Sequence, residues 1–226
     1  MHNGASLRDG VTGLEKVITL IIRLPNLMEV EMAGDAKKPI TEVRRRDRNQ
    51  EEDWIRVFLH AGAWGALATV SESRPFINTN LYVYDEAKHA IYLHGARIGR
   101  TRSNIEAGGP VCFNVSEMGR ILPDEVALEF SVEYAGVTVF GQCTVVDDED
   151  EAYRGLQMLM DKYAPQLQPD RDYRPAGRED LVRTSVYRID IEAWSGKMNE
   201  KDADFPGAFW FEHYRQASPF SPVGRK

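Results

Sequence analysis

The sequence predicts an α+β protein in which a β-barrel carries a few peripheral helices. Many short segments alternate apolar and polar residues, as half-buried strands do, and turn-forming residues separate them. Only a few windows show the period of an amphipathic helix. A chain of 226 residues suits one domain with terminal extensions. Together these features favour a closed barrel with helical additions.

Four segments are predicted as helices. In the first, apolar residues recur at helical spacing, and Asn49 with Glu52 resembles a capping box. Asp147 is the expected cap of the longest helix, which ends near Tyr163. Two glycines, Gly108 and Gly109, end a short helix that follows a basic turn. The predicted helices span residues 51–61, 100–107, 147–163 and 178–182.

Six segments are predicted as strands. The second, 75–84, alternates along its whole length, and a short loop, 85–88, joins it to the next strand. Gly136 and Gly141 interrupt the longest segment, where they predict bulges or close approach of a ligand. The predicted strands span residues 64–70, 75–84, 90–94, 111–115, 130–146 and 184–191, and 130–146 is long enough for two strands.

Composition narrows the function classes. The net charge of −7 gives no general attraction to nucleic acid or to anionic membranes. Cys112 and Cys143 lie in apolar strand patterns and are expected to be buried, reduced thiols, so we expect a cytoplasmic protein. The chain lacks the usual zinc, serine-hydrolase, P-loop and dinucleotide-binding motifs, and no metal site is predicted.

Both ends fall outside the predicted domain. Residues 1–43 form an N-terminal extension that is either disordered or lies before the true start. Its apolar run, 17–24, is too short to span a bilayer, although 12–32 could form an amphipathic helix. At the other end, 198–226 is a tail whose aromatic side chains are expected to cover the barrel or a partner. These aromatic residues are Phe209, Trp210, Phe211 and Tyr214.

A basic turn is the most informative local feature. His94 stands at the end of a predicted strand, and Arg97, Arg100 and Arg102 crowd the start of the next helix. Helix N-termini and arginine side chains both favour phosphate. The alternative is that these basic residues are only solvated. From the residues alone, His94 is equally open to a role as an ordinary hydrogen-bonded histidine.

The chain resembles the pyridoxamine 5′-phosphate oxidase-like family of FMN-binding split barrels, and within it the branch of nitroimidazole-resistance reductases. The resemblance runs from about Arg44 to Lys197, which sets the predicted domain at 44–197. Its residues include WIRVFLHAGAWGALAT, PFINTNLYVYDE, YLHGARIGRTRSNI, EFSVEYAGVTVFG, DLVRTSVYRIDI and EAWSGK. It implies FMN at the interface of a homodimer, a small-molecule electron acceptor, and a nicotinamide nucleotide or another protein as electron donor.

The resemblance also implies roles for particular residues. His94 corresponds to a histidine beside the flavin ring and would donate a proton to the acceptor. Arg100 corresponds to the arginine of the family's phosphate motif, whereas Thr101 stands where the lysine is expected, so that Arg97 or Arg102 would supply the charge. The implied FMN contacts are Ile77, Asn78, Thr79, Asn80, Leu81, Tyr82, His94, Gly95, Arg100, Thr101, Arg102, Trp194 and Lys197.

Several alternatives stay open at this stage. The polar residues of 77–82 could be only the exposed face of a strand, and Trp194 could be a core residue. A non-enzymatic flavin- or haem-binding protein is one alternative function, with His94 as an axial ligand. A true pyridoxamine 5′-phosphate oxidase is another, but the substrate-binding Arg-x-His-x-Arg element is replaced after Gly196 by KMNEKDADF.

Overall fold

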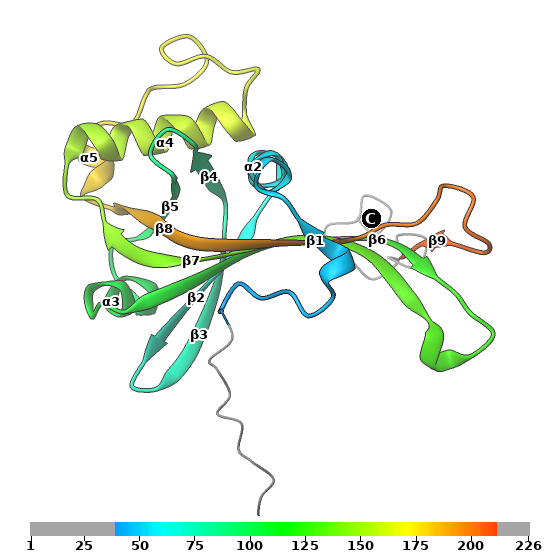
Figure 1. Ribbon diagram of the computed structural model, residues 1–226. Coiled ribbons are helices and arrows are strands. Elements are labelled where there is room, and N and C mark those ends of the chain that lie inside the picture. The colour runs from blue at the N-terminus through cyan, green and yellow to red at the C-terminus, as the bar shows by residue number, and fades with distance from the viewer. Residues whose placement is uncertain (1–38, 212–226) are drawn as a thin grey trace, which may run out of the picture. The chain divides into compact units, whose positions relative to one another are not determined.

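The computed structural model describes residues 39–211, which belong almost entirely to the compact unit Thr41–Lys226. In this part of the chain, one antiparallel sheet is accompanied by helices (Figure 1). The strands are β1 (Asn49–Gln50), β2 (Gly65–Ser71), β3 (Arg74–Asn80), β4 (Tyr82–Asp85), β5 (Ala90–Ala96), β6 (Pro110–Leu122), β7 (Ser131–Val145), β8 (Thr184–Asn199) and β9 (Phe209–Trp210). The helices are α2 (Glu52–Ala61), α3 (Arg100–Glu106), α4 (Glu149–Tyr163) and α5 (Arg178–Leu181), with 3₁₀ turns η1 (Arg46–Arg48) and η2 (Ala127–Glu129).

The sheet follows the order β3-β2-β6-β7-β8-β5-β4, while β1 pairs with β8 and β9 pairs with β6. The predicted α+β class with a split barrel and peripheral helices is confirmed. The prediction of a closed barrel is wrong, because β3 and β4 end the path and no hydrogen-bonded ladder joins them. Two edges therefore remain in the described sheet, although β3 and β4 are neighbours in sequence.

The separation of β3 from β4 corrects the prediction of one continuous strand over 75–84. The chain leaves the ladder at Leu81, so β3 pairs with β2 whereas β4 pairs with β5. A tyrosine from α4 occupies the break: the Tyr163 hydroxyl accepts the N–H of Tyr82 at 3.1 Å and lies 2.8 Å from the carbonyl of Ala63. This hydroxyl satisfies main-chain groups that a continuous ladder would otherwise pair. The alternation of the sequence does not reveal such a distant partner.

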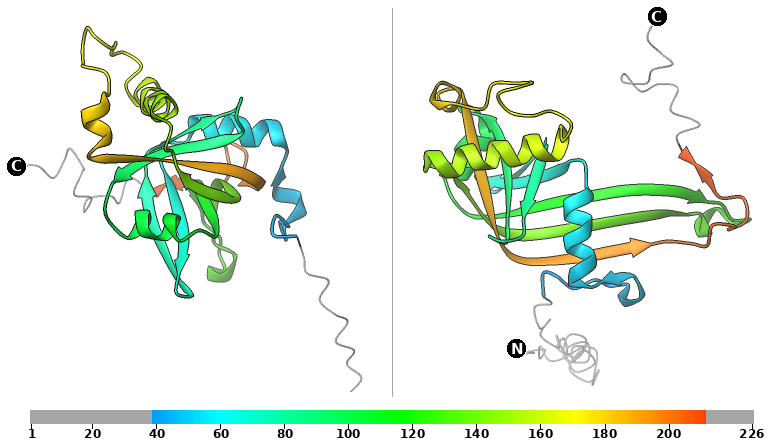
Figure 2. Two further views of the ribbon diagram at one scale, coloured as in Figure 1. Left: turned by 90° about the vertical axis from the view of Figure 1, so that its left-hand side faces the viewer. Right: turned by 90° about the horizontal axis from the view of Figure 1, so that it is seen from above.

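Two strands are longer than predicted. β6 continues past Val115 to Leu122, and β8 continues past Ile191 to Asn199, so the start of the predicted tail is strand. The extension of β6, the turn after it and the first part of β7 form an arm, residues 117–135, that projects from the barrel with the extension of β8 alongside (Figures 1 and 2). The extra length was missed because charged and small residues interrupt the alternation of apolar residues there, which is typical of loops.

A charged pair holds the arm to the chain that follows β8. Arg120 donates to both carboxylate oxygens of Glu133, at 2.6 and 2.8 Å. The same guanidinium donates to the carbonyls of Lys201, Asp202 and Ala203. The Arg120 and Glu133 side chains are only 15% and 12% exposed. Because every partner is a strong acceptor for a planar guanidinium, the pair fixes the arm against the returning segment.

The core lies on both faces of β5. Ile91 and Leu93 belong to the main apolar cluster, whereas Ala90 and Tyr92 belong to a second cluster under α4. The predicted alternation of β5 is therefore confirmed. The predicted helix caps are wrong: Glu51 precedes α2 without a side-chain cap, and the cap of α4 is Asp148, which accepts the N–H of Glu151.

The region around Gly141 confirms a predicted bulge. The register of β7 on β8 shifts between Phe140 and Gly141. A Cβ atom at Gly141 would lie 2.0 Å from the main-chain oxygen of Asp190, a distance that no side chain tolerates. The ladder shows no shift at Gly136, so the expectation of a bulge there is wrong.

Two further predictions concern the whole described region. Cys143 is buried and Cys112 is half-buried, and both are free thiols. Burial raises the pKa of the Cys143 thiol to about 12, so it stays protonated at neutral pH.

No helix between residues 39 and 211 is long and apolar enough to cross a membrane. Residues 1–38 and 212–226 lie outside the description, and with them most of the predicted N-terminal extension and Tyr214.

Candidate functional site

The basic turn leads directly into α3. Gly99 precedes the helix with a φ of 138°, a conformation that other residues rarely adopt. It has no side chain to cap the helix, so no side chain takes the N–H groups of the first turn. The predicted helix 100–107 is confirmed, but α3 has only seven residues. Binding of an anion here would therefore depend on side chains as well as on main-chain N–H groups.

Two predicted segments meet at this turn. The Asn78 amide donates to the Thr101 hydroxyl at 3.4 Å and to the Asn80 side-chain oxygen at 3.3 Å. The Arg100 guanidinium is exposed and lies 5.8 Å from the centre of the Phe76 ring. We call Asn78, Arg100 and Thr101 the turn cluster. It brings an exposed cation together with a half-buried hydroxyl and amide, which is the chemistry that a phosphate group requires.

The other two arginines of the turn are already engaged. Arg97 donates to the main-chain oxygen of Leu181 at 2.7 Å. Arg102 forms a 2.6 Å ion pair with Glu106 and donates to the Ser185 hydroxyl at 2.8 Å. Neither guanidinium is aimed at the turn cluster. To supply the charge of the lysine that Thr101 replaces, Arg97 or Arg102 would have to give up the contacts with Leu181, Glu106 and Ser185.

The exposed side of β3 carries the next predicted contacts. Ile77 is 66% exposed and Leu81 is 49% exposed, and Thr79 lies between them on the same face. Tyr82 differs, because its side chain is fully buried and its hydroxyl donates to the carbonyl of Leu59 at 2.7 Å. Within one chain, Tyr82 is thus a core residue, whereas the residues before it remain available to a ligand.

His94 faces a cavity of about 570 Å³ between β5, α4 and the loop after α4. The residue is exposed by surface area, yet the cavity walls surround its ring closely enough that burial lowers the pKa of the imidazole below its ordinary value. Gly95 follows it, and a Cβ atom there would lie 3.3 Å from the Tyr187 ring. The geometry gives a neutral imidazole at neutral pH, facing a space that includes the apolar side chains of Leu156, Leu159 and Met160.

Trp194 lies elsewhere in the chain. Its ring packs against His89, with 4.5 Å between ring centres, and against Tyr84 at 6.1 Å. His89 is five residues before His94, or about 17 Å at about 3.3 Å per residue, so Trp194 is at the opposite end of β5 from His94. One chain therefore does not bring Trp194 to His94.

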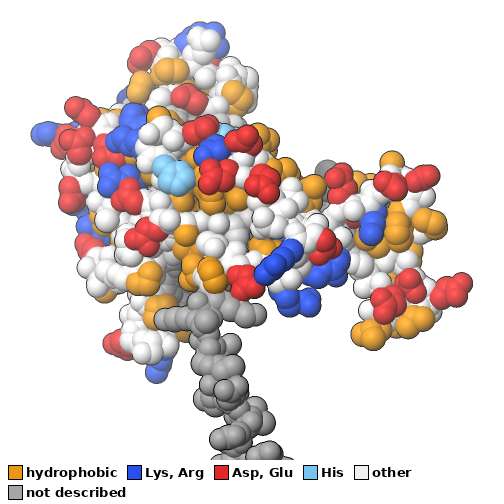
Figure 3. Space-filling view, in the orientation of Figure 1, with side chains coloured by type: hydrophobic (Ala, Val, Ile, Leu, Met, Phe, Trp, Pro, Cys, Tyr) orange, Lys and Arg blue, Asp and Glu red, His pale blue; other side chains and the backbone are white. Residues whose placement is uncertain are grey.

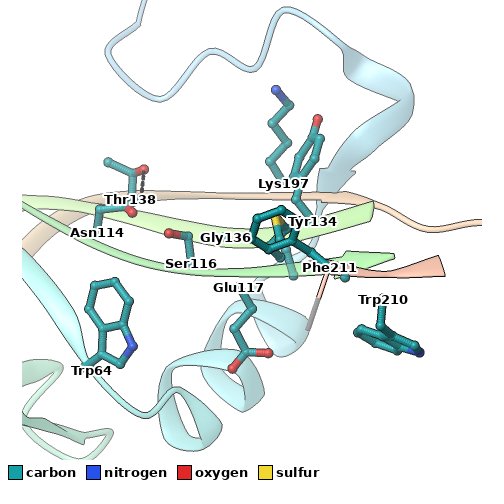
Figure 4. Close-up of a pocket in the computed structure, with 13 residues that line it drawn as sticks. Trp64, Asn114, Ser116, Glu117, Tyr134, Gly136, Thr138, Lys197, Trp210 and Phe211 are labelled. Atoms are coloured by element: carbon teal, nitrogen blue, oxygen red, sulfur yellow. Dashed lines mark hydrogen bonds between the residues drawn. The ribbon is translucent and has the colours of Figure 1, made fainter. Parts of the chain in front are cut away.

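Lys197 lies on the face of β8 that Trp194 does not occupy, and its partner on the neighbouring strand β7 is Gly136. It lines a second cavity of about 820 Å³, shown in Figure 4, together with side chains from β6, β7 and the segment around β9. The Lys197 ammonium lies 5.0 Å from the centre of the Tyr134 ring, and the Arg48 guanidinium donates to the Tyr134 hydroxyl at 2.8 Å.

Arg48 and Tyr134 were not predicted as site residues. Arg48 belonged only to a basic stretch, and Tyr134 to the alternation of a strand, so neither had a signal of its own. Among residues 39–211, no group of three or more His, Cys, Asp or Glu side chains could hold a metal ion.

Solved structures with the same fold bind several cofactors by name. A flavocytochrome from Azotobacter vinelandii is 19% identical with a TM-score of 0.62, over 79% of this chain and 80% of that one. An FAD and haem binding protein from Mycobacterium smegmatis is 20% identical with a TM-score of 0.61, over 70% and 77%. A protein from Bacteroides thetaiotaomicron named for 5-nitroimidazole antibiotic resistance is 14% identical with a TM-score of 0.55, over 66% and 84%. At these identities the similarity shows the fold alone.

A family model provides the stronger link. No curated protein matches the sequence. The model described as pyridoxamine 5′-phosphate oxidase matches residues 51–198, which is more than half of the chain and spans α2 to the end of β8. The chain is therefore a member of the pyridoxamine 5′-phosphate oxidase family.

Proposed function

We propose that the protein is an FMN-binding oxidoreductase that reduces a small acceptor. The carrying observation is the turn cluster, where Asn78 of β3 meets Thr101 at 3.4 Å beside the exposed Arg100. Two segments assigned to FMN by family resemblance thus converge on one place with phosphate-binding chemistry. The isoalloxazine ring and ribityl chain would then lie along the edge strand β3, beside Asn80 on the face of Asn78 and over its exposed edge.

We propose further that two copies of the chain complete the site. Trp194 packs on His89, which is five residues or about 17 Å from His94 at about 3.3 Å per residue, so one copy would not place both at the same edge of one flavin. Ile77, Leu81 and Ile98 are 66%, 49% and 89% exposed next to the turn cluster, which is unusual for apolar side chains that only face water. A second copy would cover them and supply Trp194 to the flavin.

In this proposal the bound flavin supplies the electron transfer, and the chain supplies binding and orientation. Arg100 and Thr101 would hold the phosphate. His94 would face the acceptor across its cavity and, being neutral at neutral pH, would donate a hydrogen bond through its N–H group. A nicotinamide nucleotide would be the electron donor and a nitroaromatic compound one suitable acceptor. The two free thiols support a reducing compartment such as the cytoplasm.

The test is cofactor identification followed by one substitution. Absorbance of the purified protein and chromatography of the molecule released by heat should identify FMN. Arg100→Ala should weaken FMN binding about tenfold or more, the loss of one charge-assisted hydrogen bond. Arg46→Ala, which removes another exposed arginine, should not. A colourless protein that takes up no added FMN would disprove the proposal, and a monomer with FMN bound would disprove its two-copy form.

Haem binding is the second candidate, because the His94 ring faces a largely apolar cavity without a hydrogen-bond partner among the described residues. A neutral imidazole is the form that ligates iron. A Soret band that is altered in His94→Ala would favour haem. The oxidase activity of the family's name is the third candidate, and release of hydrogen peroxide with pyridoxamine 5′-phosphate would support it. The replaced element after Gly196 speaks against it.

A further inference from the structure

A second group of cationic side chains lies at the base of the arm. Arg48 belongs to η1, Tyr134 to β7 and Lys197 to β8. The Arg48 guanidinium donates to the Tyr134 hydroxyl at 2.8 Å and lies 5.6 Å from the ring centre, and the Lys197 ammonium lies 5.0 Å from the same ring. We call these three residues the arm cluster. They come from three distant parts of the sequence and contact one phenol.

The arm cluster carries positive charge without a carboxylate to balance it. Within residues 39–211, neither Arg48 nor Lys197 forms an ion pair, although the whole chain has a net charge of −7. Figure 3 shows blue Lys and Arg side chains gathered near η1 and β1. Burial alone would raise the pKa of the Tyr134 phenol, but hydrogen bonds from Lys197 and Arg48 outweigh it and lower the pKa. Such surroundings favour a bound anion.

The cavity next to the arm cluster has aromatic walls. Trp64, Trp210 and Phe211 line it and are 49%, 50% and 48% exposed. Large aromatic side chains left half-exposed around one cavity are typical of a ligand site that takes a flat ring. Glu117 also lines the cavity, but Figure 4 shows it, like Trp64 and Trp210, on the side of the strands opposite Lys197 and Tyr134.

We propose that the arm cluster and this cavity bind a nucleotide. Arg48 and Lys197 would hold its phosphate, and its base would stack on Phe211. The inference rests on the proposed function, because the turn cluster already accounts for the phosphate of FMN and a second anion site needs a second phosphate. That phosphate has two sources with the same chemistry: the AMP half of a dinucleotide flavin, or the nicotinamide nucleotide that donates electrons.

The test measures binding of AMP to the full chain loaded with FMN, by titration calorimetry. AMP should bind, and Lys197→Met and Arg48→Met should each raise its Kd about tenfold or more, as expected for loss of a charge-assisted hydrogen bond. Lys201→Met is the matched control, since Lys201 is an exposed lysine close by in sequence with no ion pair in the described structure. Phe211→Ala should weaken binding of AMP but leave binding of pyrophosphate unchanged, because Phe211 would touch only the base.

Competition experiments with FAD and with the reduced nicotinamide nucleotide distinguish the two sources of the phosphate. If FAD binds more tightly than FMN, and the FAD-loaded protein no longer takes AMP, the site holds the AMP half of the flavin. If FAD has no advantage and the reduced nicotinamide nucleotide competes with AMP, the site holds the electron donor. FMN-loaded protein that binds neither AMP nor pyrophosphate, with equal affinities for FAD and FMN, would overturn the inference and leave FMN binding intact. Failure to bind FMN at all would instead reject the proposed function.

Discussion

The turn cluster and the arm cluster are both small groups of polar and cationic side chains, but they are built differently. The turn cluster joins residues within 24 positions of sequence, Asn78 to Thr101, on a strand and the helix that soon follows. The arm cluster spans Arg48 to Lys197 and exists only because β7 and β8 run side by side past the barrel. The first depends on a local motif, and the second depends on the tertiary fold.

This difference also concerns rigidity. The arm cluster stands at the base of a projecting hairpin whose position depends on the Arg120–Glu133 pair and its carbonyl partners. The turn cluster is anchored to the barrel through α3, because the Asn104 amide of this helix donates to the buried Thr69 hydroxyl at 2.8 Å. Substitutions can therefore disturb one cluster while the other stays intact, and hydrogen exchange and titration can measure the two clusters separately.

The largest expected effect is that of Arg120→Met on the arm. The substitution removes five hydrogen bonds made by the guanidinium and leaves Glu133 without its cation. The free energy of opening residues 117–135 should fall by about 2–3 kcal/mol, since breaking a paired, hydrogen-bonded charge costs more than a surface contact. Hydrogen exchange should show faster exchange in the arm and unchanged protection in β3 and α3.

The control for this substitution is Arg45→Met, which breaks an exposed ion pair with Asp47 and should change the free energy of opening the arm little.

The wild-type arm should also lose protection from hydrogen exchange in acid. Hydrogen bonds from Arg120 lower the pKa of Glu133 to about 2, so this stabilisation is present above the ordinary carboxyl pKa and is lost as pH falls toward about 2. Equal loss of protection in both clusters would mean that arm and barrel open as one unit.

The predictability of the two regions follows from the same contrast. The β5–turn–α3 segment was predicted with nearly correct bounds, because strand alternation, Gly99 and the arginines are all local signals. The arm and the extension of β8 beside it were missed, since charged and small residues interrupt the apolar alternation of 116–122 and 192–199, which gain their order from cross-strand pairing. The break at Leu81 was missed because Tyr163, which satisfies the main chain there, lies about 80 residues away.

Tyr163→Phe tests the turn side of the comparison. The hydroxyl that accepts the Tyr82 N–H and lies 2.8 Å from the Ala63 carbonyl is lost, so two main-chain groups lose their partner. The free energy of unfolding should fall by about 1–2 kcal/mol. The amide of Tyr82 should exchange faster, with the arm unchanged. Tyr173→Phe is the matched control, because its hydroxyl only accepts from Gln157 at the surface loop.

A smaller effect is expected from the titration of His94. Burial in its cavity lowers the pKa of the imidazole, so protonation is easier in the unfolded chain. The neutral form therefore adds stability above the ordinary histidine pKa, and this contribution is lost as pH falls through the lower folded value. Nuclear magnetic resonance of the ring protons should give a midpoint below that of a free histidine, with His94→Gln to assign the signal. A midpoint at or above the ordinary value would mean that the cavity is open to water.

The smallest effect is expected in the arm cluster itself and concerns the Tyr134 phenol. Hydrogen bonds from Lys197 and Arg48 lower its pKa despite partial burial, so Lys197→Met and Arg48→Met should each raise it. The ultraviolet spectrum of tyrosinate follows this titration, with Tyr134→Phe to identify the signal and Lys201→Met as the neutral control. Arg120→Met should raise the pKa as well, because the arm would then hold Tyr134 less firmly between its two cations. If only the direct substitutions act, the arm cluster is held by β8 and η1 alone, and its dependence on the arm is disproved.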